Sequence, residues 1–167
     1  MEDKIPILGL NPGTKYVGWV VFRGPELRDW GIKTLKGPWS AQKIAEMKVF
    51  IGGLVARYGI GRLAVKRLNP ARSSQNLTRL TAEIVRYLDG MGIEGEAHSI
   101  GEMKAFFSPD GKKINRRKLA ELVAQEYPPL YPLLEREKKN RNSYYLWLFE
   151  AVALGAMAYH KGPIANY

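Results

Sequence analysis

Three short apolar segments separated by turn residues open this sequence and limit what it can fold into. The segments are Ile5–Leu10, Tyr16–Phe22 and Leu27–Leu35. Between them stand Asn11–Thr14 and Gly24–Pro25, which are rich in the residues that tight turns require. Consecutive strands joined by tight turns pair antiparallel. The first part of the chain is therefore predicted to form a three-stranded antiparallel meander, whose apolar faces need other elements to cover them.

The remainder of the chain alternates helical and strand-like patterns. A strand that returns to the same sheet through a helix lies parallel to its neighbour. We therefore expect an α/β fold with a five-stranded mixed sheet, three antiparallel strands followed by parallel strands, flanked by helices. The predicted elements are a helix capped by Ser40 and extending to Tyr58, helices Ser74–Asp89, Asn115–Tyr127 and Tyr144–His160, and strands Arg62–Leu68 and Ile93–Ile100.

Length and composition narrow the class of protein. The 167 residues, 46% of them hydrophobic, suffice for one domain with a buried core, and we expect residues 1–167 to form a single domain. The absence of cysteine excludes a disulfide scaffold and a thiol nucleophile, and is typical of a cytoplasmic protein. The longest apolar run, Tyr144–Ala158, contains Glu150 and is shorter than the roughly 20 residues of a bilayer span. A cytoplasmic protein without membrane contact is expected.

An excess of positive charge points to an anionic partner. The chain has 26 Lys and Arg against 16 Asp and Glu, a formal net charge of +10, and nucleic acid is the commonest partner of such chains. Five cations fall between Lys112 and Lys118, at the start of a predicted helix, where the helix dipole disfavours positive charge. A solvated basic surface is the alternative. The candidate nucleic-acid-binding residues are Lys15, Arg67, Arg72, Arg79, Lys104, Lys112, Lys113, Arg116, Arg117, Lys118, Lys138, Lys139 and Arg141.

Three motifs carry a resemblance to a known family. The first is Ile7–Lys15 followed by Val17–Val21, the second is Leu63–Lys66, and the third is Glu150–His160. In this order, over nearly the whole chain, they resemble the motifs of the RuvC-type Holliday-junction resolvases, members of the ribonuclease H-like superfamily. The resemblance implies a ribonuclease H-like fold, a role in DNA recombination and repair, recognition of Holliday junctions, and a two-fold homodimer.

The resemblance also implies which positions should carry the chemistry. The family hydrolyses phosphodiesters with two divalent ions held by four carboxylates. The corresponding positions here are Asn11, Lys66, Trp147 and Glu150, so one acid remains. A lysine at a metal position repels the ion, and tryptophan offers no oxygen ligand. We therefore predict no catalytic residue, no metal and no cofactor, and an inactive pseudo-nuclease that binds branched or structured DNA, rather than RNA, through backbone contacts.

Glu150 needs a partner of its own, because an unpaired carboxylate inside an apolar helix is costly. We expect the Lys66 ammonium to pair with Glu150 and to hold the final helix against the fourth strand. The alternative for Lys66 is a solvated lysine at a strand end. Trp147 is expected to pack in the core. The segment Asn11–Gly13 is interpreted as a remnant active-site loop, although these residues also suit an ordinary turn.

Two other functions stay open. The first is an active endonuclease whose magnesium or manganese ligands would be Glu150 and Asn11, completed by Glu102 or Asp110. The second is a non-enzymatic interaction subunit that binds RNA or an acidic protein. For assembly, the helix Ser74–Asp89 is the candidate contact of a homodimer.

Overall fold

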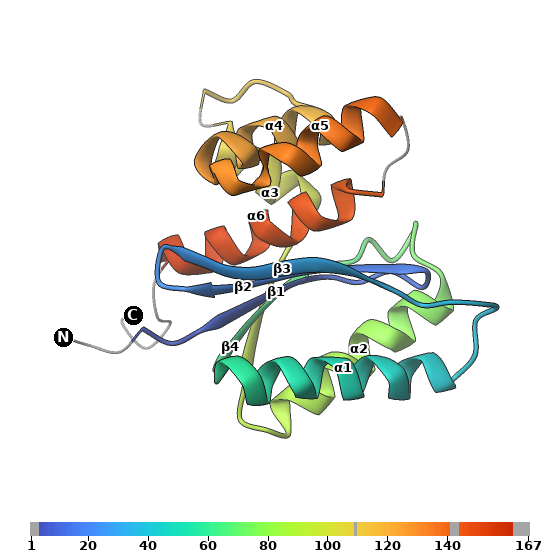
Figure 1. The fold of residues 1–167 in the computed structure, drawn as a ribbon. Helices are drawn as coiled ribbons and strands as arrows, with labels where there is room; N and C mark the ends of the chain where they lie inside the picture. The colour runs from blue at the N-terminus through green and yellow to red at the C-terminus, as the bar shows by residue number, and fades with distance from the viewer. Residues whose placement is uncertain (1–3, 109, 141–143, 162–167) are drawn as a thin grey trace.

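A five-stranded sheet forms the centre of the computed structural model, which describes residues 4–108, 110–140 and 144–161 (Figure 1). Its strands are β1 (Ile7–Asn11), β2 (Tyr16–Arg23), β3 (Glu26–Thr34), β4 (Arg62–Lys66) and β5 (Glu94–His98). They lie in the order β3-β2-β1-β4-β5. The pairs β1/β2 and β2/β3 are antiparallel, and the pairs β1/β4 and β4/β5 are parallel. The α/β fold and mixed sheet expected from the sequence are confirmed.

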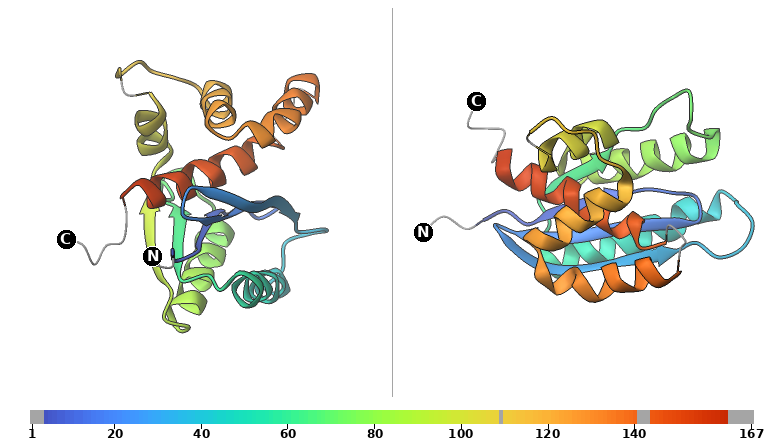
Figure 2. Two further views of the ribbon diagram at one scale, coloured as in Figure 1. Left: turned by 60° about the vertical axis from the view of Figure 1, so that its left-hand side comes forward. Right: turned by 90° about the horizontal axis from the view of Figure 1, so that it is seen from above.

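Helices cover both faces of the sheet (Figures 1 and 2). One face carries α1 and α2, and α6 lies across the other. On the side of α6 away from the sheet, α3, α4 and α5 form a further layer (Figure 1). The bounds are α1 (Gln42–Tyr58), α2 (Gln75–Asp89), α3 (Ile100–Phe107), α4 (Arg116–Glu126), α5 (Tyr131–Asn140), α6 (Leu146–Lys161) and a 3-10 turn at Pro128–Leu130.

The alternation of side chains along β1 divides the core in two. Leu8 and Leu10 belong to the apolar cluster between the sheet and the α1/α2 layer. Ile7 belongs to the cluster shared with α6 and α4. Because all five β1 residues are buried, the strand is a central one with both faces covered. The carboxyl end of β1 is thereby fixed directly beneath α6.

Glycines let α6 lie unusually close to the sheet. A Cβ at Gly9 would overlap the Ala151 carbonyl, and a Cβ at Gly18 would overlap the Trp147 carbonyl. A Cβ at Gly155, on the helix itself, would overlap the Phe22 ring. At Gly9 and Gly18 the helix backbone therefore rests directly on the backbone of β1 and β2, and at Gly155 it rests on the Phe22 ring. This close approach brings the first turns of α6 to the ends of the strands.

Side-chain caps explain where several helices begin, whereas two helices were not predicted from the sequence. Ser74 accepts the Leu77 amide and Asn115 accepts the Lys118 amide, as N-caps do. The predicted Ser40 cap is wrong, because α1 begins after Ala41 without a side-chain cap. The missed helices are α3, within the segment read as strand and loop, and α5, which follows Pro128–Leu130 directly. Because Ile100 begins α3, β5 ends at His98 and not at Ile100.

Within the described ranges, no helix combines the length and the apolar character needed to cross a bilayer.

Candidate functional site

The residues at the motif positions meet where β1 and β4 end beneath α6. Asn11 is the last residue of β1 and Lys66 the last of β4. The two strands are parallel neighbours, with Leu10 opposite Val65, so the ends of both strands lie side by side. Glu150 projects from the second turn of α6 and is 1% exposed. The sheet register and the close approach of the helix therefore assemble the site.

The Glu150 carboxylate is held by three donors. Lys66 Nζ lies 3.3 Å from Oε1, and Arg116 Nε lies 2.5 Å from Oε2. Asn11 Nδ2 donates to Oε1 at 3.4 Å and to the Trp147 carbonyl at 3.3 Å. The predicted ion pair between Lys66 and Glu150 is confirmed. A buried carboxylate with charged donors on both oxygens meets the condition under which burial of charge is tolerated.

Arg116 is the member of this cluster that the sequence analysis did not place there. It is the first residue of α4, which follows the Asn115 cap, and its side chain is 38% exposed. A cation in the first turn of a helix is unfavourable unless an acid neutralises it. The cation at the start of the predicted helix therefore indicates an acidic partner within the chain as well as a preference for phosphate.

Trp147 covers the turn between β1 and β2. A Cβ at Gly13 would overlap the Trp147 ring, so the indole lies directly against the backbone of this turn. The side chain is half-buried and belongs to neither apolar cluster. The expectation of core packing is therefore corrected, since Trp147 lies at the rim of the site, where the family motif has a carboxylate.

The donor set does not fit a pair of divalent ions. Hard cations such as magnesium take anionic and neutral oxygens, and here the oxygen donors are Glu150 and the Asn11 Oδ1 atom, which is buried without a hydrogen-bond partner. Lys66 and Arg116 already neutralise the carboxylate. Across the described residues, no group of three or more His, Cys, Asp or Glu side chains could hold a metal. The residues present do not match a two-metal centre.

The acids considered as substitute ligands are engaged elsewhere. Asp110 accepts hydrogen bonds from the Ser108 hydroxyl and the Lys112 amide. Glu102 forms a capping box with Ser99 at the start of α3 and pairs with Arg67 at 2.9 Å. Hydrogen bonds from Ser99, together with the Arg67 charge, hold the Glu102 pKa below its usual value. Both carboxylates therefore already have local partners.

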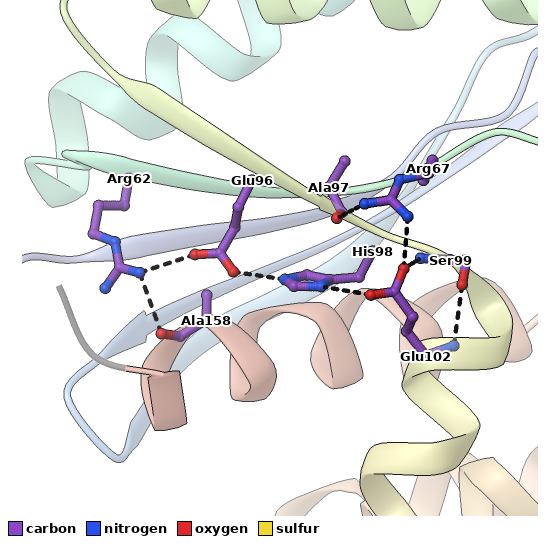
Figure 3. A network of polar contacts seen from close by, with 8 residues as sticks. All are labelled: Arg62, Arg67, Glu96, Ala97, His98, Ser99, Glu102 and Ala158. Atoms are coloured by element: carbon purple, nitrogen blue, oxygen red, sulfur yellow. Dashed lines mark hydrogen bonds and ion pairs between the residues drawn. The ribbon is translucent and has the colours of Figure 1, made fainter. Parts of the chain in front are cut away.

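A second charged network runs beside the site along the β4–β5 edge (Figure 3). His98 is 4% exposed, and its Nε2 lies 2.5 Å from a Glu96 oxygen, while Nδ1 lies 3.8 Å from Glu102. Glu96 also pairs with Arg62, which donates to the Ala158 carbonyl of α6. The network joins β4, β5, α3 and α6. It also holds Arg67, which pairs with Glu102 and donates to the Ala97 carbonyl.

The predicted nucleic-acid contacts lie in different surroundings. Lys104, Lys112 and Lys113 line one open pocket of about 340 Å³ between α3 and the segment before α4. Other predicted contact residues form ion pairs with acids of the chain. Arg117, for example, lies 3.2 Å from the buried Glu137, although the pair lacks hydrogen-bond geometry. The remaining pairs are Lys118 with Glu121 at 3.6 Å and Lys138 with Glu135 at 3.8 Å. Lys15, Arg72, Arg79 and Lys139 are exposed, and Arg141 lies outside the described residues.

Solved structures similar to this chain include RuvC and a mitochondrial Holliday-junction resolvase. Thermus thermophilus RuvC in complex with a Holliday junction substrate matches at a TM-score of 0.70 and 14% identity, covering 95% of this chain and 96% of that chain. Another T. thermophilus RuvC structure matches at 0.67 and 15%, covering 90% and 91%. The yeast mitochondrial resolvase Ydc2 matches at 0.58 and 10%, covering 95% and 78%. By sequence, neither a family model nor a curated protein matches. The RuvC-type, ribonuclease H-like fold expected from the motifs is thus established.

Proposed function

We propose that this chain is a catalytically inactive RuvC-like protein that binds branched or structured DNA through its phosphates and does not cut it. The observation that carries the proposal is the cluster around Glu150, where two fixed cations surround the one acid left at the motif positions. We further propose that residues 1–167 act as one domain in the cytoplasm, and as a homodimer in which α2 is the candidate contact.

Electrostatics oppose metal binding at this cluster. Glu150 contributes one negative charge, and Lys66 and Arg116 contribute two positive charges, so the cluster carries a net charge of +1. A dication about 4 Å from one ammonium would be repelled by about 8 kcal/mol at an effective dielectric constant of about 20. With a single carboxylate to offset this repulsion, neither of the two ions required for the family's hydrolysis would be retained.

Charge and fold support a nucleic-acid partner. The chain carries a formal net charge of +10, and three lysines line the pocket between α3 and α4. Thermus thermophilus RuvC, which has the same fold, is a protein solved with a Holliday junction. Lysine and arginine contacts to phosphates fix a protein on nucleic acid without reading its sequence. Backbone recognition is therefore the mode of binding that we propose.

A cleavage and binding assay tests this function. The protein is incubated with labelled four-way junction, linear duplex and single strands in magnesium or manganese, and both retardation and strand scission are followed. We expect tighter binding of the junction and no products in either metal. Metal-dependent scission that Glu150→Ala abolishes would instead establish a nuclease with an unusual ligand set. Binding of structured RNA in preference to every DNA would refute the choice of DNA.

A further inference from the structure

The geometry of the Glu150 cluster points to an anion-binding site: we propose that Lys66 and Arg116 together bind one phosphate group at the place where the fold's relatives would hold metal. The inference that this phosphate belongs to nucleic acid rests on the proposed function. The binding of a phosphate oxyanion as such does not. The site is distinct from the lysine pocket between α3 and α4, whose lining residues include neither Lys66 nor Arg116.

The first reason is unbalanced charge. Two cations share the single Glu150 carboxylate, which is 1% exposed and faces the sheet. The Lys66 side chain is 25% exposed and the Arg116 side chain 38% exposed, so the acid is covered while both cations reach the surface. An approaching anion therefore meets the cations before it meets the carboxylate.

The second reason is the supply of unused donors. A lysine ammonium carries three N–H donors and a guanidinium carries five in a planar fork. Lys66 directs one donor to Oε1, and Arg116 directs Nε–H to Oε2. With respect to the described residues, most donors of both groups thus stay available, and the fork geometry of arginine suits a phosphate well.

The third reason is the position of α4. Its first residue is Arg116, so the guanidinium belongs to a residue at the positive end of the helix dipole. Such a helix start favours an anion. Because both cations contact the same carboxylate, they lie close to one another. Charge, free donors and helix dipole therefore favour the same occupant.

Removal of the Glu150 charge provides the sharpest test. Glu150→Gln keeps the shape of the side chain while it releases both cations from ion pairing. The matched control is Glu46→Gln on α1, because Glu46 also serves two lysines, Lys33 at 3.5 Å and Lys43 at 4.0 Å. Both variants raise the net charge by one unit. Only the first does so at the proposed site, so a general charge effect is separated from a local one.

Junction affinity is measured for each variant at fixed salt. We expect Glu150→Gln to bind roughly threefold to tenfold more tightly, because freed charged donors can then contact a phosphate, and Glu46→Gln to change affinity by less than about twofold. Adding Lys66→Gln to Glu150→Gln should cancel the gain. Thermal unfolding of each variant verifies that it is folded. Equal gains for Glu150→Gln and Glu46→Gln, or no gain for either, would overturn the assignment to nucleic acid.

A second measurement separates this inference from the proposed function. The wild-type protein, labelled with nitrogen-15, is titrated with inorganic phosphate while the Arg116 Nε–H resonance is observed. A saturable shift that is lost in Lys66→Gln, with chloride as the ionic-strength control, supports the anion site even if no nucleic acid binds. If the protein binds the junction but phosphate leaves the Arg116 resonance unmoved, the site is refuted and the proposed function stands.

Discussion

Removing the two cations from Glu150 should destabilise the protein strongly, and removing the carboxylate as well should restore much of the loss. Glu150 is 1% exposed, so it cannot regain full hydration when its partners disappear. Loss of one partner from Lys66→Met or Arg116→Met should cost about 1.5–3 kcal/mol, the contribution of a charged hydrogen bond. The double variant should lose about 3–5 kcal/mol, because a buried charge is then left uncompensated.

Urea unfolding followed by circular dichroism gives these free energies. The decisive comparison is the triple variant, in which Glu150→Gln is added to the double change. With no charge left to bury, it should recover at least about half of the loss, since replacement of a whole buried ion cluster is often nearly neutral. A double variant as stable as the wild type, or a triple variant no better than the double, would show that the cluster does not anchor α6.

Three further outcomes are expected. If phosphate contacts dominate binding, log affinity should fall with log salt, and Lys112→Ala with Lys113→Ala should reduce the slope by about one unit per lysine; an affinity that ignores salt would argue for a protein partner. Because the folded-state pKa of Glu102 is lowered by Ser99 and Arg67, its contribution to stability is present above the unfolded-state pKa and is lost as pH falls through the folded-state pKa. Unfolding measured against pH should therefore show a weaker acid dependence in Glu102→Gln, and an unchanged profile would contradict that account. Calorimetry should detect manganese binding only in a variant that regains the motif acids and also lacks the Arg116 cation. The changes in this variant are Asn11→Asp, Lys66→Glu, Arg116→Gln and Trp147→Asp. The single change Lys66→Glu should not restore manganese binding.

Much of the fold can be predicted from the sequence because turn residues, apolar spacing and helix caps are local patterns. The meander follows from its turn residues, and helices α2 and α4 follow from apolar spacing and from the caps at Ser74 and Asn115. The missed helices had weaker patterns. α3 is only eight residues long, and its start is marked by the capping box of Ser99 and Glu102, which could have been recognised. α5 follows two prolines and half of its residues are charged, so apolar spacing gives little sign of it.

The part of the site that lies at the motif positions could be predicted from the sequence. The pair between Lys66 and Glu150 spans 84 positions in sequence, and the family likeness brings the two together. Arg116 comes from outside the motifs, and its distance from Glu150 depends on how α4 stacks on α6. No local pattern encodes that stacking. Tertiary packing therefore added the second cation, which changes a simple ion pair into a positively charged cluster.

Under the proposed function, the Glu150 cluster couples the exclusion of metal to the stability of the fold. In a two-metal site, exchangeable ions would neutralise the acids, and the helix would depend on their supply. Here the neutralising charges are covalent parts of β4 and α4, and they join both elements to α6 whether or not divalent ions are present. A change that makes room for metal therefore also removes a structural contact. Under the two proposals above, the same two side chains would exclude the ions, hold the helix and present positive charge to a phosphate, so these three properties should change together on substitution.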